Sequence, residues 1–215
     1  MPILELPQAT IHYLDVGHGE PLLLLSANPG THRDFAAIMP SLAKHYRVLA
    51  LDWAGYGESI LHVDAHSVSA TFYFELLEAF IKKLNLSSLR IIGNSLGGNA
   101  GARYAIKYPQ QVKALVLVST GGFTPHNFFT RAFCRWQGSR WAISPNLLAK
   151  LYLRVRTPTV ADMLARAKGE QSSTSQRLVN QAVWRSFIAP EHDLRPIASQ
   201  LHTPTLLIFG RYDPI

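Results

Sequence analysis

Five short apolar runs, separated by stretches with helical spacing, constrain this chain's fold more than any other feature. Each run is four to seven residues long and apolar through its middle. Such runs are typical of strands that helices cover on both faces. Because they alternate with helical stretches, they predict a mainly parallel sheet, preceded by an antiparallel hairpin over Ile3–Gly17. The runs are Leu22–Leu25, Arg47–Asp52, Leu89–Gly93, Lys113–Ser119 and Thr205–Gly210.

Two helices are expected between these runs. Apolar residues at positions 73, 76, 77, 80 and 84 recur at the interval of one helical face. A second helix should extend from about Leu96 to Tyr108. Pro109 ends it, because proline lacks the N–H that a helix interior needs.

The alternation of strands and helices lapses between residues 122 and 190. Phe129, Ala132, Phe133 and Trp136 again follow one helical face, and further helical patches come after them. We therefore expect residues 122–190 to form a helical cap, inserted into a core made of residues 1–121 and 191–215. The predicted fold class is α/β, a mainly parallel sheet flanked by helices with a helical cap insertion.

The composition is that of a globular protein. Hydrophobic residues make up 47% of the chain and charged residues 16%, which excludes a disordered protein. Cys134 is the only cysteine, so no disulfide can form within the chain, and this favours a reducing compartment. The first ten residues do not resemble a signal peptide, and no apolar run is long enough to span a bilayer. The sequence therefore predicts a cytoplasmic protein.

The formal charge of +7 is confined to one segment. Residues 123–195 hold eleven Lys and Arg against four Asp and Glu, whereas the rest of the chain holds ten of each kind. The same segment carries nine aromatic residues. We do not expect nucleic acid as a partner, because no known binding motif is present.

This basic, aromatic cap has three interpretations. The first is a solvated lid. The second is a lid that selects a substrate with an apolar body and a negative group, since Arg pairs with carboxylate and phosphate. As a third possibility it contacts an anionic membrane surface, with Arg131 and Arg135 on one side of a helix and aromatic rings on the other. The aromatic residues named as candidates for substrate binding are Phe129, Phe133 and Trp136.

Ser95 lies in the strongest candidate for a catalytic motif. The segment Gly93–Gly98, GNSLGG, directly follows an apolar run and opens the next expected helix. Such a strand–turn–helix holds a serine in a strained backbone conformation with its hydroxyl exposed, and small residues on either side permit the tight turn. A glycine-rich phosphate loop is the alternative. No lysine follows these glycines, however, and the G-x-G-x-x-G pattern is absent here.

Four motifs, in order along essentially the whole chain, resemble the α/β-hydrolase superfamily. Ser26–Gly30 (SANPG) stands where the family usually has His-Gly-x-x-Gly, and Asp52–Ser59 (DWAGYGES) resembles its D-x-x-G-x-G-x-S turn. Gly93–Gly98 is similar to its nucleophile elbow. Phe209–Asp213 (FGRYD) resembles the loop that carries its catalytic acid.

This resemblance implies a set of catalytic roles. Ser95 would be the nucleophile and Asp213 the acid that orients a histidine base. The backbone N–H of Leu96, just after the nucleophile, would stabilise the oxyanion. By resemblance, the backbone N–H of Asn28 would be the second donor. No metal and no organic cofactor is implied.

The histidine of this family follows the acid after one more helix and strand. Only Pro214 and Ile215 follow Asp213, so we expect a C-terminally truncated chain that lacks the last helix, strand and histidine loop. Among the nine histidines present, His126 lies beyond the carboxyl end of a predicted strand and is the one candidate for a substitute base. We expect the 215-residue chain to be inactive.

The expected activity is hydrolysis of a small ester, thioester or similar carbonyl substrate through an acyl-enzyme on Ser95. A carbon–carbon bond hydrolase is the alternative, because Gly93–Gly98 and Thr120–Gly122 (TGG) resemble enzymes that cleave aromatic ring-fission products. A non-catalytic binding protein that keeps the pocket is a further alternative. The sequence predicts neither the substrate nor the oligomeric state.

Overall fold

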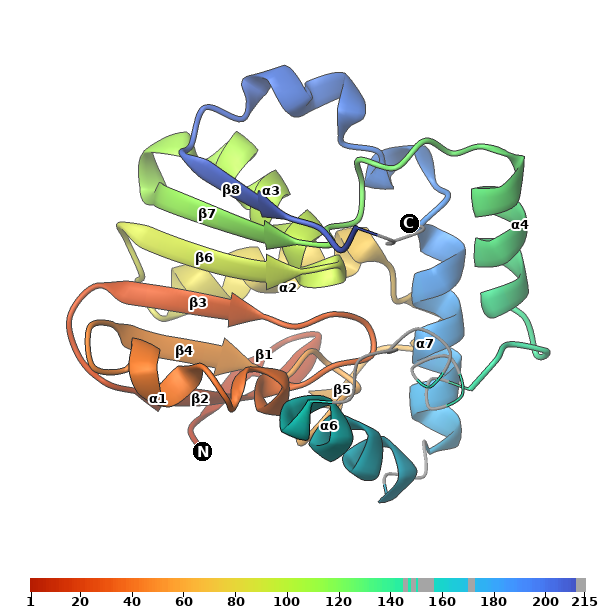
Figure 1. The fold of residues 1–215 in the computed structure, drawn as a ribbon, viewed down its shortest axis with the longest axis horizontal. Helices are drawn as coiled ribbons and strands as arrows, with labels where there is room; N and C mark the ends of the chain where they lie inside the picture. Colours follow the sequence, from red (N-terminus) through yellow and green to blue (C-terminus); the bar gives the residue numbers. More distant parts are fainter. Residues whose placement is uncertain (145–146, 148–149, 151–156, 170–172, 212–215) are drawn as a thin grey trace.

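The computed structural model describes residues 1–144, 147, 150, 157–169 and 173–211, and it contains an eight-stranded sheet (Figure 1). The strand order is β1-β2-β4-β3-β6-β7-β8, and β5 pairs with β2 beside this path. The strands are β1 (Ile3–Leu6), β2 (Ala9–Val16), β3 (Pro21–Leu25), β4 (Arg47–Leu51), β5 (Ile60–Leu61), β6 (Leu89–Asn94), β7 (Val112–Val118) and β8 (Thr205–Ile208).

The sheet is mainly parallel, which confirms the predicted fold class. Neighbouring strands from β4 through β3, β6 and β7 to β8 are parallel, whereas β1 and β2 form an antiparallel hairpin that joins β4. Each of the five apolar runs overlaps one of these parallel strands, with bounds that differ by one or two residues. The sequence did not predict β5, because a strand of two residues is too short to show alternation.

Alternate residues of the central strands face two different layers. Leu23 and Leu25 of β3 pack into the larger core with helices α2 (Ala70–Lys83) and α3 (Leu96–Lys107). Leu22 and Leu24 face a smaller cluster that includes Met39 of the short helix α1 (Met39–Leu42). Burial on both faces explains why β3 and β4 read as continuous apolar runs. Strand β8 differs from this expectation, because Leu206, Leu207 and Ile208 are exposed at the edge of the sheet.

Helix α2 forms where the apolar spacing predicted it. Ser69 caps its start, since its side-chain oxygen accepts a hydrogen bond from the Phe72 N–H at 3.0 Å. Tyr73, Leu77 and Phe80 are fully buried in the core. Helix α3 begins at Leu96 and ends at Lys107, just before Tyr108 and Pro109.

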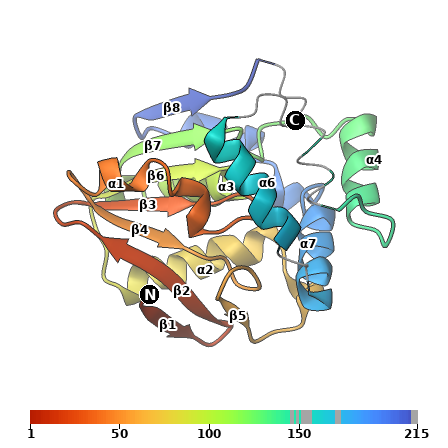
Figure 2. The same cartoon turned by 60° about the horizontal axis from the view of Figure 1, so that its bottom comes forward.

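Within the described part of the chain, helices lie across the side of the molecule toward which the parallel strands point (Figure 1). They are α4 (Phe128–Gln137), α6 (Pro158–Gly169) and α7 (Thr174–Ser186). Val179, Ala182 and Val183 of α7 are buried in the same cluster as the sheet. Helix α4 packs on α7 and lies outside it in both views (Figures 1 and 2). That residues 122–190 are a domain of their own stays a prediction.

Short 3₁₀ turns connect these elements where the structure describes the chain: η1 (His32–Phe35), η2 (Ala65–Ser67), η3 (Pro109–Gln111), η4 (Pro190–His192) and η5 (Arg195–Gln200). Within the residues that the structure describes, none of the helices is both long and apolar enough to cross a bilayer.

Candidate active site

Ser95 occupies the turn between β6 and α3. Its backbone has φ 49° and ψ −109°, a left-handed conformation that is strained for a residue with a side chain. Three hydrogen bonds hold it there: the Ser95 N–H donates to the Val118 carbonyl at 3.0 Å, and the Ser95 carbonyl accepts from Asn99 at 2.9 Å and from Gly121 at 3.2 Å. The surrounding backbone therefore fixes the predicted nucleophile in the conformation that the elbow motif implied.

The glycines around Ser95 are required by close backbone contacts. A Cβ atom at Gly93 would lie 2.5 Å from the Gly97 carbonyl oxygen, and one at Gly97 would overlap the Leu25 backbone. Because glycine has no Cβ at these two positions, α3 can start directly against the ends of β3 and β6. The elbow spacing in the sequence thus reflects the packing of main chain on main chain.

The loop after β3 is tied to the same turn. The Ser26 carbonyl accepts hydrogen bonds from the Gly97 N–H at 3.1 Å and from the indole N–H of Trp53 at 2.9 Å. Trp53 is fully buried. These bonds join the end of β3, the start of α3 and the turn after β4.

The Asn28 side chain anchors this loop on both sides. Its Nδ2 donates to Oδ1 of Asn180 in α7 at 2.8 Å, and its Oδ1 accepts from the Tyr56 hydroxyl at 2.6 Å. Burial raises the pKa of Tyr56 well above its ordinary value, so the hydroxyl keeps its proton and stays a donor. Sequence reasoning named Asn28 but missed Tyr56 and Asn180 as its partners. Tyr56 lies within a recognised motif, whereas Asn180 carried no local signal.

The two predicted oxyanion donors come from adjoining segments. Leu96 is the first residue of α3, so its N–H has no acceptor within the helix, and a helix N-terminus favours negative charge. Asn28 belongs to the loop that the Gly97–Ser26 hydrogen bond ties to that helix. Their role as oxyanion donors stays a prediction.

The Asp52–Ser59 motif forms a structural turn. The carboxylate of Asp52 is fully buried and accepts from the His32 N–H and ring Nδ1, both at 2.8 Å, and from the Glu58 N–H at 3.3 Å. The Ser59 hydroxyl donates to the Asp52 carbonyl at 2.8 Å. These bonds fold the turn that carries Trp53 and Tyr56 toward the candidate site.

Asp213 lies outside the described residues, so its role as the catalytic acid stays a prediction. Strand β8, which precedes it, runs parallel to β7, and the Ser119 N–H donates to the Ile208 carbonyl at 2.8 Å. The chain therefore leaves β8 at the same edge of the sheet as the turn that carries Ser95.

His192 packs against the segment that holds Ser95. It is buried, its ring stacks on Phe187 with centroids 4.8 Å apart, and its Nδ1 has no hydrogen-bond partner. A Cβ atom at Gly121 would lie 3.2 Å from Nε2 of His192 and 3.8 Å from the Ser95 carbonyl oxygen. Burial above all, with the nearby His126 and Arg103, lowers the pKa of His192 to about 4. The imidazole is thus neutral at pH 7. Sequence reasoning placed His192 at the end of the cap but missed its burial beside the segment that holds Ser95.

A hydrogen-bonded base for Ser95 is not found among the described histidines. The Ser95 hydroxyl makes no hydrogen bond to either His126 or His192 within the described part of the chain. The His126 carbonyl accepts from Arg131 Nε at 3.0 Å, which places this residue at the start of α4. Its role as a substitute base stays a hypothesis.

The cap aromatics named from the sequence differ in their surroundings. Phe129 is 80% exposed and Trp136 44% exposed. Phe133 is half-buried and packs edge-to-face on Trp184 of α7, with ring centroids 5.4 Å apart. Their contact with substrate stays a prediction.

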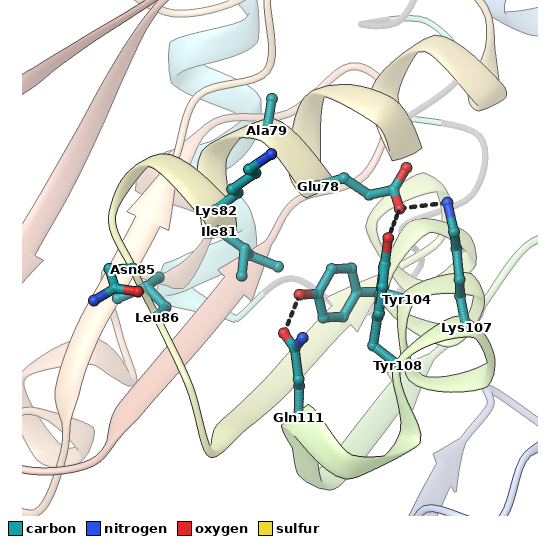
Figure 3. Close-up of a pocket in the computed structure, with 10 residues that line it drawn as sticks. All are labelled: Glu78, Ala79, Ile81, Lys82, Asn85, Leu86, Tyr104, Lys107, Tyr108 and Gln111. Atoms are coloured by element: carbon teal, nitrogen blue, oxygen red, sulfur yellow. Dashed lines mark hydrogen bonds and ion pairs between the residues drawn. The ribbon is translucent and has the colours of Figure 1, made fainter.

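A hollow of about 460 Å³ lies at the far ends of α2 and α3 and is lined by residues such as Lys82 and Tyr104 (Figure 3). Its polar side chains bind one another: Tyr104 donates to Gln111 at 2.6 Å, and Lys107 and Tyr108 both donate to Glu78 at 2.7 Å. Since α3 begins at Leu96, next to Ser95, and its other end lies here, this hollow is separate from the candidate active site.

Known proteins are similar to this chain in sequence or in fold. A serine hydrolase-like protein of Danio rerio is 32% identical over 108 residues, which is half of this chain but only 33% of that protein. The 2-hydroxy-6-oxo-6-phenylhexa-2,4-dienoate hydrolase of Comamonas testosteroni is 25% identical over 97% of this chain and 77% of its own length. A hydrolase structure from Pseudomonas aeruginosa superposes with a TM-score of 0.78 at 22% identity, covering 98% of this chain and 80% of that one. The family model of the alpha/beta hydrolase fold matches residues 20–215, and the chain belongs to this family.

Proposed function

We propose that the protein hydrolyses a small ester, thioester or related carbonyl substrate through an acyl-enzyme on Ser95. The observation that carries this proposal is the strained backbone of Ser95. It has φ 49° and is held by three hydrogen bonds at the N-terminus of α3. Strain that the surrounding structure fixes so firmly is a feature of functional sites.

The chemistry follows from the groups around this turn. The Ser95 oxygen attacks the carbonyl carbon while its proton passes to a general base, and the C=O oxygen becomes an oxyanion. Backbone N–H groups of Leu96 and Asn28 donate to that oxyanion. Collapse of the intermediate expels the alcohol or thiol with a proton, and water then releases the acid from Ser95 by the reverse steps. By family resemblance the base is a histidine oriented by Asp213.

Turnover of p-nitrophenyl esters tests this proposal. It should be measured on wild-type protein that hydrolyses these esters, beside its variants. In the active form, Ser95→Ala should lower kcat on the order of 10⁶-fold, because a triad loses most of its rate when the nucleophile is removed.

Ser119→Ala is the matched control. Ser119 also follows a strand with a positive φ, 42°, but no elbow motif surrounds it. It should leave kcat within a few-fold of wild type. Ester hydrolysis that survives Ser95→Ala would overturn the proposal.

Carbon–carbon bond hydrolysis is the second candidate. It is favoured by the Comamonas testosteroni relative, which carries that activity in its name and aligns with nearly all of this chain. A direct comparison of kcat/KM for a 2-hydroxy-6-oxo-dienoate and for short p-nitrophenyl esters separates the two. A preference for the dienoate, abolished by Ser95→Ala, would select the second candidate.

A further inference from the structure

Helix α4 and the turn after it present large aromatic rings to solvent. Phe128 is 78% exposed, Phe129 80% and Trp141 69%, and Trp136 is 44% exposed. Exposed rings forgo about 25 cal/mol for each Å² of apolar surface left in water. Phe128 and Phe129 also contact each other, with ring centroids 5.7 Å apart, and grouped exposed apolar side chains mark a candidate interaction site. We call Phe128, Phe129, Arg131, Arg135, Trp136, Arg140 and Trp141 the α4 surface.

The outward half of α4 is divided between aromatic and basic rows. Cys134 and Gln137 are the buried positions of the helix, on the side that packs on α7. Residues four apart stand above one another on a helix. Phe128 and Trp136 therefore share one exposed row, and Arg131 and Arg135 share another.

The charge of this region has one sign. Residues 122–161 contain six Lys and Arg and no Asp or Glu. Among the described residues, Arg131, Arg135 and Arg140 form no ion pair with a carboxylate. The Arg140 guanidinium lies 4.9 Å from the centre of the Trp141 ring, which places a cation and an aromatic ring together at the surface.

We propose that the α4 surface docks the protein onto an anionic lipid membrane. An amphipathic helix with aromatic rings beside basic residues lies in the plane of the headgroups, with its rings at the acyl boundary and its cations on lipid phosphates. Tryptophan suits this boundary because its ring is apolar and its N–H is polar. The absence of carboxylates from residues 122–161 removes the repulsion that would oppose such contact.

The position of α4 adds a functional consequence. It is the outermost helix on the side toward which the parallel strands point in both views (Figures 1 and 2). A membrane held there would face the cap and the edge of the sheet where Ser95 lies. This inference goes beyond the proposed hydrolysis, and it does not depend on catalysis.

Co-sedimentation with lipid vesicles tests the proposal on the whole chain. The vesicles are phosphatidylcholine alone and phosphatidylcholine mixed with phosphatidylglycerol. We expect binding to the mixed vesicles at low salt, little binding to phosphatidylcholine, and release as salt shortens the reach of exposed charge.

Two variants address the two rows. Phe128→Ser with Phe129→Ser removes rings that are four-fifths exposed, and Arg131→Gln with Arg135→Gln removes two cations, so neither pair disturbs the core. Each should lower the partition coefficient for anionic vesicles by about tenfold or more. For the arginine pair this is the size expected for two basic residues at such a surface, and for the phenylalanine pair it follows from the apolar area that no longer leaves water.

Matched controls carry the same chemical changes elsewhere. Ile3→Ser with Ile38→Ser removes two exposed apolar side chains, and Lys82→Gln with Lys83→Gln removes two charges from α2. Both should bind like wild type. A thermal melt confirms that each variant is folded.

Three results would overturn the proposal. One is equal binding to neutral and anionic vesicles. Another is loss of binding in the Lys82 and Lys83 variant as large as in the Arg131 and Arg135 variant, which would indicate net charge alone. The third is a dimer, seen by size-exclusion chromatography, that Phe128→Ser with Phe129→Ser converts to a monomer while vesicles are not bound; the surface would then meet a second copy of the chain.

Discussion

The turn around Ser95 and the surface of α4 are built in opposite ways. At the turn, main-chain atoms contact main-chain atoms, and a Cβ added at Gly97 would overlap the Leu25 backbone. On α4, Phe129 touches mostly solvent and is 80% exposed. The contrast shows where this chain is constrained: a side chain added at Gly97 would displace backbone, whereas a change at Phe129 would cost the fold little.

Substitution of Gly97 should have the largest effect on stability and tests that contrast directly. Gly97→Ala places a methyl group against the Leu25 backbone, which cannot move without displacing β3. We expect it to lower the free energy of unfolding by roughly 3 kcal/mol or more, a large part of the roughly 5–15 kcal/mol typical of a domain. Chemical denaturation measures the change.

Phe129→Ser is its counterpart on the cap. The free energy of unfolding should stay within about 0.5 kcal/mol of wild type, as for most surface substitutions. If Gly97→Ala unfolds at the same denaturant concentration as Phe129→Ser, the contrast between the two regions is wrong.

The burial of His192 should make stability depend on pH. Its pKa is lowered to about 4 in the folded protein, against about 6.5 in an unfolded chain. Between these values the unfolded chain binds a proton that the folded protein does not. The contribution of neutral His192 to the free energy of unfolding is therefore fully present above about pH 6.5. It is lost as the pH drops toward 4, by up to about 3 kcal/mol.

His192→Phe tests this pH dependence. The phenyl ring can keep the stacking on Phe187 and cannot take up a proton. Relative to wild type, the variant should gain stability as the pH is lowered from 8 to 4. A difference in the free energy of unfolding between the two proteins that stays the same at every pH would show that His192 does not titrate in this way.

The anchor of the loop after β3 should have a smaller effect, on rate. Asn28→Ala and Asn180→Ala each break the 2.8 Å hydrogen bond between Asn28 and α7. We expect each to lower kcat by about tenfold, since misplaced oxyanion donors lose part of their stabilisation of the transition state. KM should change less.

The double variant separates positioning from independent effects. Asn28→Ala removes the bond to Asn180 together with the one from Tyr56, so the double variant should be little slower than Asn28→Ala alone. Fully additive losses would mean that the two side chains do not act through each other.

Much of the sheet and the elbow could be predicted because local sequence encodes them. The runs that became β3 and β4 are buried on both faces, and the glycine spacing at Gly93–Gly98 follows from backbone contacts. The run that became β8 also formed a strand, but its exposure could not be predicted from its apolar sequence. The partners of Asn28 could not be predicted this way. Asn180 lies 152 residues along the chain from it, and a polar residue on a helix looks the same whether it faces solvent or a loop.

The environment of His192 shows the same limit. Its burial results from how the segment that leaves the cap packs on Asn99, which donates to the His192 carbonyl at 3.2 Å. Sequence spacing alone places this histidine at the end of the cap. Likewise, helical spacing grouped Phe129, Phe133 and Trp136, but only packing shows that Phe133 contacts Trp184 while the other two rings are exposed.

Covalent labelling of Ser95 tests the central claim most directly. A preparation that turns over p-nitrophenyl esters is treated with a fluorophosphonate and analysed by peptide mass spectrometry, beside Ser95→Ala and Ser119→Ala. We expect a single phosphonyl adduct on Ser95, retained in Ser119→Ala and absent from Ser95→Ala. An unmodified Ser95 in that active preparation, or an adduct on another residue, would contradict the assignment of Ser95 as the nucleophile.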